Sequence, residues 1–149
     1  MQEQTSSRTL PGNFVGREIT QDRVTRYSAE KQPLLSKAIG KTDTGSIWYT
    51  FRQIEDIYKE LVFLKADGLR FYLGAYEENH ADFADQLCLL MVPTRLNPET
   101  NRHRDVVLEE EPEFEKRLEI SRSLGLVKDF NYGSPCPPVC PPHELRYTQ

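Results

Sequence analysis

The chain has 149 residues, of which 38% are hydrophobic and 28% are charged, a profile typical of one ordinary globular domain. Its net charge is −4 and no segment is rich enough in Lys and Arg to neutralise many phosphates, so nucleic acid is not expected as a partner. The longest apolar run, Leu87 to Val92, is far shorter than the roughly 20 residues that span a bilayer. The first twenty residues lack the apolar core of a secretory signal, so we expect a cytoplasmic protein without a membrane partner.

The amino-terminal quarter is predicted to hold an arm and two short helices. Residues 1–18 are polar and lack any sustained period, which is typical of an extended arm. Thr20 or Asp22 can cap a first helix, which should stop near Lys31 because Pro33 removes a backbone donor. Pro33 suits the first turn of a second helix, and Gly40 suits its left-handed end.

The middle of the chain carries the strongest periodic signals. A short strand is expected around Ile47–Tyr49, and Thr50 followed by Gln53 forms a capping-box signature. Apolar residues at three- and four-residue steps then predict a helix over Phe51–Lys65. The alternation over Leu69–Ala75 predicts a strand, and together these elements predict a right-handed strand–helix–strand crossover.

The second half is predicted to add two strands and a helix. The run Gln86–Val92 is apolar from Leu87 onward, which indicates a central strand covered on both faces and closed by Pro93. The polar segment 94–105 is expected to be a loop before a short strand, Val106–Leu108. Pro112 suits the first turn of a helix that ends at Gly125 and turns three residues inward, Phe114, Leu118 and Ser121.

These elements predict an α+β fold with a small mixed sheet of three or four strands and helices packed on one face. Residues 1–18 form the extended arm, 19–130 the single domain and 131–149 a tail rich in Pro and Cys. The expected core joins one face of the sheet to the long helix. It comprises Leu69, Phe71, Leu73, Ala75, Leu87, Leu89 and Met91 from the strands, with Ile54, Tyr58 and Leu61 from the helix.

The tail contains three potential ligands for a soft metal. Cys136, Cys140 and His143 are spaced C-x-x-x-C-x-x-H, and a fourth ligand could come from Cys88, His80 or His103. Pro137 and Pro138 favour polyproline II, in which four residues advance about 12 Å. At that distance the two sulfurs cannot share one metal ion or one disulfide, so we expect unmodified thiols and no cofactor. A metal site and a Cys136–Cys140 disulfide are the alternatives.

The same tail is a candidate for binding a protein surface. A preformed polyproline helix loses little entropy when it docks in an aromatic groove. The expected partner-binding residues are Phe130, Tyr132, Pro137, Pro138, Val139, Pro141 and Pro142. Docking on the chain's own domain would make the tail a lid over the sheet. We favour docking on a neighbouring copy, because exchanged arms are a low-cost route to homo-oligomers. A disordered tail is the remaining alternative.

Two charged loops could bind ions. Glu77–Asp85 is rich in acidic side chains but lacks the order of a calcium-binding loop, so a solvated loop is favoured. A basic loop could bind a phosphate or an acidic partner, although a solvated loop is again favoured. Its residues are Arg95, Arg102, His103 and Arg104.

Catalysis has no sequence motif in its favour. The chain lacks G-x-S-x-G, a Walker loop and H-E-x-x-H, so no catalytic residue is assigned. An enzyme would need a pocket in which polar groups converge, such as Arg70, Tyr72 and Tyr76.

Several short segments carry a resemblance to other sequences. They are Trp48-Tyr49-Thr50-Phe51, residues 66–76 (ADGLRFYLGAY), Met91-Val92-Pro93-Thr94, Asn131-Tyr132-Gly133 and residues 136–141 (CPPVCP). Over roughly residues 20–142 the chain resembles a group of small uncharacterised bacterial proteins. The resemblance implies that strand, loop and tail belong to one unit, and it implies no activity, substrate or catalytic residue.

The sequence therefore favours a non-catalytic protein-interaction or self-assembly module that uses its terminal arms, with protein, including a second copy of the chain, as its partner. One alternative is a small metal-binding protein that uses Cys136, Cys140 and His143. The other is an enzyme of a class that no motif reveals.

Overall fold

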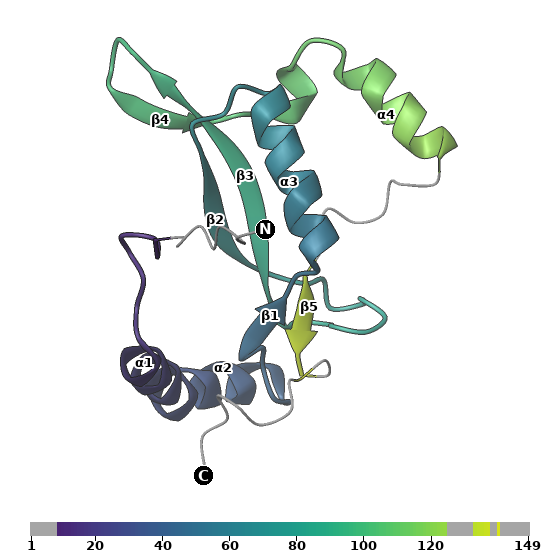
Figure 1. The fold of residues 1–149 in the computed structure, drawn as a ribbon. Coiled ribbons are helices and arrows are strands. Elements are labelled where there is room, and N and C mark those ends of the chain that lie inside the picture. Colours follow the sequence, from purple (N-terminus) through teal and green to yellow (C-terminus); the bar gives the residue numbers. More distant parts are fainter. Residues whose placement is uncertain (1–8, 125–132, 138–139, 141–149) are drawn as a thin grey trace, which may run out of the picture.

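A computed structural model describes residues 9–124, 133–137 and 140 of the chain. Helices α1 (Arg17–Glu30) and α2 (Gln32–Ile39) lie end to end at one end of the molecule (Figure 1). Helix α1 begins earlier than predicted, and Thr20 lies inside it, where its hydroxyl donates to the Gly16 carbonyl at 3.0 Å. The predicted end of α2 is confirmed, since Gly40 adopts a left-handed conformation with φ of 72°.

The turn after α2 is organised by Asp43, a residue that no sequence motif marks. Asp43 is 3% exposed, and its Oδ1 accepts hydrogen bonds from the backbone N–H groups of Thr44 and Leu87, both at 2.7 Å. Its carbonyl accepts from Gln32 Nε2 at 2.7 Å, and its N–H donates to Ser36 Oγ at 2.8 Å. Asp43 thus joins α2 to the beginning of β3 (Leu87–Asn97).

The strand after this turn pairs with the tail. Strand β1 (Ser46–Trp48) is antiparallel to β5 (Ser134–Cys136), with Ile47 opposite Pro135. Pro135 is less than 2% exposed, and the Gly45 N–H donates to the Cys136 carbonyl at 2.7 Å. The predicted crossover is wrong, because β1 takes its partner from the far end of the chain and not from the strand after the helix.

Helix α3 (Phe51–Phe63) confirms the predicted capping box. The Gln53 N–H donates to Thr50 Oγ1 at 3.1 Å, and the Thr50 N–H donates to Gln53 Oε1 at 2.8 Å. One stripe of the helix, formed by Ile57 and Leu61, is partly covered. A second stripe, which we call the apolar stripe, is more than half exposed and consists of Phe51, Ile54, Tyr58 and Val62.

The three-stranded sheet has the order β2–β3–β4 and is antiparallel. Strand β2 (Gly68–Ala75) pairs with β3 so that Phe71 lies opposite Met91 and Leu73 opposite Leu89. The α+β class is confirmed, with the strands divided between two antiparallel sheets. The central position of β3 is also confirmed, but Leu90 is 44% exposed, so β3 is not covered on both faces.

The sequence predicts that Pro93 ends β3, but Pro93 lies within the strand. Its carbonyl accepts from the Val106 N–H at 2.8 Å, just beyond the end of β4 (Arg102–Asp105). Proline has no backbone N–H to donate. In this antiparallel ladder the missing N–H belongs to the position where pairing with β4 stops, so few hydrogen bonds are lost.

The expected loop 94–105 is a hairpin, and β4 replaces the strand predicted at Val106–Leu108. A 3-10 helix, η1 (Leu108–Glu110), lies where that strand was expected to end. Helix α4 (Phe114–Ser123) follows, and it begins after Pro112, which the sequence placed in its first turn. Its three expected inward residues are all partly buried. Arg117 attaches α4 to α3, because its Nη2 donates to Glu60 Oε1 at 2.6 Å and its guanidinium lies 4.3 Å from the centre of the Phe63 ring.

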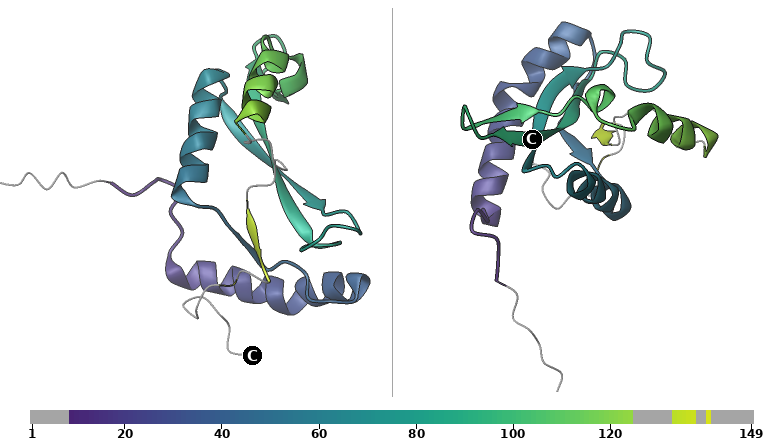
Figure 2. Two further views of the ribbon diagram at one scale, coloured as in Figure 1. Left: turned by 90° about the vertical axis from the view of Figure 1, so that its right-hand side faces the viewer. Right: turned by 90° about the horizontal axis from the view of Figure 1, so that it is seen from above.

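The predicted core is only partly formed. We call the side of the β2–β3 hairpin that carries Leu69, Phe71, Leu73 and Ala75 the odd face. It turns toward α3 as predicted, because Arg95 on the same side of β3 donates to the Leu64 carbonyl at the end of α3 at 2.5 Å. Yet Phe71 is 53% exposed, Leu73 74%, Ile54 55% and Tyr58 65%. Figure 2 (left) shows the reason: α3 and the hairpin approach each other near the end of α3 and spread apart toward its beginning.

Within the described residues, the buried apolar side chains form a small set: Leu64, Cys88, Pro93, Val106 and Pro135. None of the helices in these ranges is long and apolar enough to cross a membrane.

Candidate functional site

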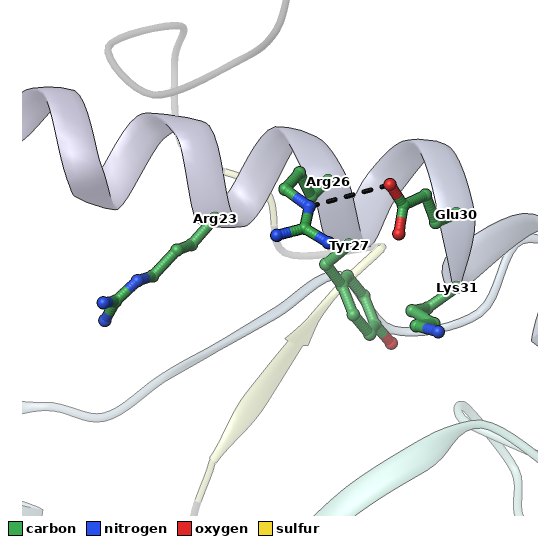
Figure 3. A pocket seen from close by; sticks show the side chains of 5 residues that line it. All are labelled: Arg23, Arg26, Tyr27, Glu30 and Lys31. Carbon is green, nitrogen blue, oxygen red and sulfur yellow. Dashed lines mark ion pairs between the residues drawn. The ribbon is translucent and has the colours of Figure 1, made fainter.

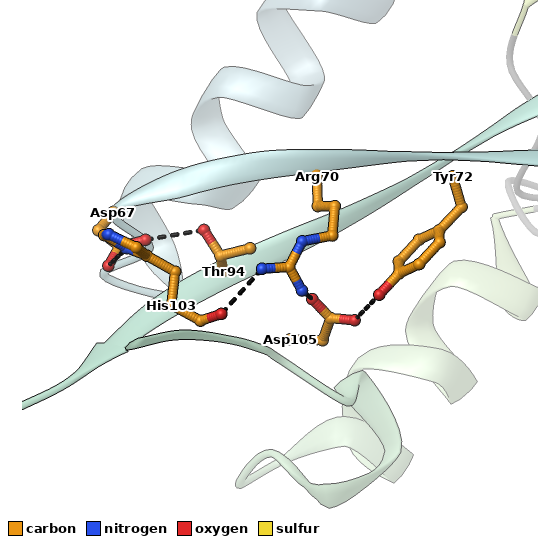
Figure 4. Close-up of polar contacts among 6 residues, drawn as sticks. All are labelled: Asp67, Arg70, Tyr72, Thr94, His103 and Asp105. Carbon is orange, nitrogen blue, oxygen red and sulfur yellow. Dashed lines mark hydrogen bonds and ion pairs between the residues drawn. The ribbon is translucent and has the colours of Figure 1, made fainter. Parts of the chain in front are cut away.

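The most connected group of polar side chains lies on the face of the β2–β3–β4 sheet opposite to the odd face (Figure 4). Arg70 bonds to the Asp105 carboxylate and donates from Nη2 to the His103 carbonyl at 2.8 Å. The Tyr72 hydroxyl donates to the other oxygen of Asp105. These bonds link β2 to β4 across the central strand.

A second set of contacts in the same cluster centres on Asp67. Thr94 Oγ1 donates to Asp67 Oδ1 at 2.7 Å, and His103 Nδ1 lies 2.8 Å from Asp67 Oδ2. The pKa of Asp67 is lowered from its ordinary value, chiefly by the hydrogen bond from Thr94 and then by the hydrogen bond and charge of His103, while desolvation opposes the shift. The carboxylate form of Asp67 is therefore favoured by the fold.

This lowered pKa predicts a pH dependence of stability. A carboxyl group whose pKa is lower in the folded chain contributes stability above its unfolded pKa, near 3.8, and loses that contribution as the pH falls through the folded value. We expect the free energy of unfolding of Asp67→Asn to fall less steeply than that of the parent below about pH 4, as measured by urea denaturation.

Thr94→Val provides the matched test, because it removes the largest cause of the shift and leaves Asp67 in place. Its pH profile should lie between those of the parent and Asp67→Asn. Three coincident profiles would show that Asp67 carries no stabilising charge.

The cluster has one feature in common with acid–base catalysts. A carboxylate on one imidazole nitrogen orients the ring in nucleophile–His–acid systems, and the Asp67–His103 pair has that form. The Thr94 hydroxyl, however, is committed to Asp67, and Tyr72 to Asp105. Arg70 and Tyr72 converge as an enzyme would require, whereas Tyr76 lies apart and contacts the rings of His80 and Phe83. The contacts of the cluster brace the three strands against one another.

A hollow of about 230 Å³ lies along α1 (Figure 3). It is lined by Arg23, Arg26, Tyr27, Glu30 and Lys31, and Arg26 Nε lies 3.6 Å from Glu30 Oε1. Its volume is below the roughly 300–1,000 Å³ of typical ligand pockets. No residue proposed from the sequence lines it, and its charged side chains lie on the exposed surface of one helix.

The structure corrects the expected geometry of the tail. Cys136 and Cys140 form a disulfide, with Cα atoms 4.6 Å apart, so the chain turns back where an extended polyproline segment was expected. The Pro137 carbonyl accepts from Gln86 Nε2 at 3.0 Å. The described part of the tail thus contacts its own chain, and docking on a neighbouring copy stays a prediction. The other expected partner-binding residues lie outside the described residues: Phe130, Tyr132, Pro138, Val139, Pro141 and Pro142.

The residues expected to complete a metal site have other partners. His103 contacts Asp67, and His80 Nδ1 accepts from the N–H groups of Asp82 and Phe83 at 3.2 and 3.1 Å. Cys88 is buried, and burial, followed by the charge of Glu77, raises the pKa of its thiol. Across the described ranges no three His, Cys, Asp or Glu side chains gather as metal ligands would, and His143 lies outside those ranges.

The expected basic loop is divided between separate contacts. Arg95 pairs with Glu111 at 3.1 Å and with the end of α3, while His103 contacts Asp67. Arg102 and Arg104 lie exposed on β4.

Comparison with known proteins gives no relative from which a function could be carried over: no family model, no curated protein and no solved structure matches the chain.

Proposed function

We propose that the chain is a non-catalytic self-assembly module, and that a second copy covers apolar surface that one copy leaves open. The observation that carries this proposal is the exposure of the apolar stripe of α3 and of Phe71 and Leu73 on the odd face. In an ordinary monomer the apolar side of an amphipathic helix and one face of an antiparallel sheet are buried against each other.

The extent of this surface supports association. Large side chains bury about 150–250 Å² each when fully covered, so six that are at least half exposed leave on the order of 700 Å² of apolar surface per chain. They are Phe51, Ile54, Tyr58, Val62, Phe71 and Leu73. Monomers rarely expose contiguous apolar patches above a few hundred Å², and a standard protein interface buries roughly 800 Å² per partner.

This proposal moves the contact surface away from the terminal arms. The described part of the carboxyl-terminal tail is already engaged with β1 and Gln86 of its own chain. The exposed apolar side chains of α3 and β2 have no comparable cover among the described residues.

The test is the mass of the full chain in solution, measured by light scattering over a range of concentrations. We expect a multiple of the 17.3 kDa chain mass that depends on concentration and changes little with added salt, because the contact is apolar. A folded protein that keeps the mass of one chain at every concentration contradicts self-assembly. Native mass spectrometry of the same sample reports bound metal, and a metal lost on changing Cys136 and Cys140 to Ser would favour the metal-binding alternative.

A further inference from the structure

The exposure of the odd face increases toward one edge of the sheet. On β3, Leu89 and Met91 are partly buried, but the residues directly opposite them on β2, Leu73 and Phe71, are 74% and 53% exposed. The missing cover therefore lies over β2, the strand at this edge of the sheet.

Strand β2 is an edge strand, and no other strand in the described ranges pairs with its outer side. The Tyr76 N–H donates to the Gln86 carbonyl at 2.9 Å, which continues the β2–β3 register and shows that even-numbered positions bond toward β3. In an antiparallel ladder the odd-numbered residues 69–75 then direct their N–H and C=O groups to the free edge. The outer edge of this eight-residue strand therefore offers a row of free N–H and C=O groups to another strand.

The two edges of the sheet differ in a way that singles out β2. Strand β4 reads Arg-His-Arg-Asp, and such charges on an edge discourage pairing with another chain. Strand β2 reads Gly-Leu-Arg-Phe-Tyr-Leu-Gly-Ala and has neither proline nor acidic residue. Its one charge, Arg70, is paired with Asp105 of the same chain.

We propose that β2 pairs antiparallel with β2 of a second copy, so that the two three-stranded sheets become one six-stranded sheet. This inference rests on the proposed function and names the surface through which it acts. A two-fold axis presents the same edge from both copies, so each strand supplies the partner that the other lacks.

The backbone pattern fixes the register of this pairing. Only odd positions carry free N–H and C=O groups, so odd residues must lie opposite odd residues, which also keeps the two odd faces on one side of the joined sheet. When the two-fold axis passes through Phe71, this residue lies opposite Phe71 of the other copy, and Leu69 lies opposite Leu73 of the other copy. Arg70 then lies opposite Tyr72 of the other copy, whose hydroxyl bonds to Asp105, so cation and carboxylate from different copies approach each other.

A matched pair of lysine variants tests the surface. Leu73→Lys places a charge on the free edge at a side chain that is already 74% exposed, and Leu34→Lys places the same charge on α2 at a side chain that is 67% exposed. We expect Leu73→Lys to have the mass of one chain by light scattering, and Leu34→Lys to keep the mass of the parent. Circular dichroism and thermal melting verify that both variants fold.

A second measurement holds even if Leu73→Lys fails to fold. Cysteine in place of Phe71 should form a disulfide between copies under mild oxidation, because paired residues in this register have Cα atoms about 5.5 Å apart, within the range of a disulfide. Leu34→Cys on α2, at an equally open position (67% exposed), should give little covalent dimer.

The outcomes separate the two proposals. An assembled parent whose mass is unchanged by Leu73→Lys, or whose Phe71→Cys variant does not cross-link, overturns pairing through β2 and leaves self-assembly standing. A parent with the mass of one chain at every concentration overturns both.

Discussion

Replacing Asp43 with alanine should cost about 2–6 kcal/mol of the free energy of unfolding, since it leaves the buried N–H groups of Thr44 and Leu87 without their acceptor, at about 1–3 kcal/mol each. The bond to Leu87 holds the start of β3 against the turn after α2. Urea denaturation with an unchanged slope measures the loss.

Asp43→Asn is the control, because it keeps an oxygen at the position of Oδ1 and should cost about 1 kcal/mol or less. It also has a spectroscopic effect. Burial, and after it the charge of Asp43, raises the pKa of Tyr27, so Asp43→Asn should lower the phenol pKa part of the way toward its ordinary value of 10.0. An alanine variant as stable as the asparagine variant would show that Asp43 does not hold the two segments together.

Among the glycines that the structure describes, Gly133 should be the one whose change to alanine is most disruptive. A Cβ atom there would lie 2.2 Å from Ile47 Cγ2 and 2.8 Å from Tyr49 Cζ, well inside van der Waals contact. Either the side chains of β1 move or β5 separates from it, and overpacking of this kind costs about 1–3 kcal/mol. Chemical denaturation of the variant measures that cost.

Gly12→Ala is the matched control, because nothing lies within 4 Å of its added Cβ, and its effect should stay within about 0.5 kcal/mol. Adding Ile47→Ala to Gly133→Ala removes the closest of the clashing atoms, so the two changes together should cost less than the sum of each alone. Strict additivity would place the cost outside the β1–β5 contact.

Local signals predicted local structure well. The Thr50 capping box, the end of α2 at Gly40 and the alternation over β2 depend on residues only a few positions apart, and each is found in the structure. Strand β4 was missed because its residues are charged and show no apolar alternation. It forms because the hairpin turn at 98–101 returns the chain along β3.

Contacts between distant segments had no such signal. The partner of Ile47 is Pro135, a residue type that usually argues against a strand, and the Asp67–His103 contact exists only because the sheet register brings the two together. Periodicity identified the apolar face of β2 correctly. It could not indicate whether another element covers that face, because cover depends on how α3 diverges from the hairpin.

The pairing of Ser46 with Cys136 also affects synthesis on the ribosome. The contacts within α1, α2 and the β2–β3 hairpin join residues that are near one another in the sequence, so these elements can fold while the chain is still being synthesised. Strand β1 leaves the ribosome well before its partner, because Cys136 follows Ser46 by 90 positions in the sequence. Nascent chains should therefore expose the open side of β1 until β5 has been made.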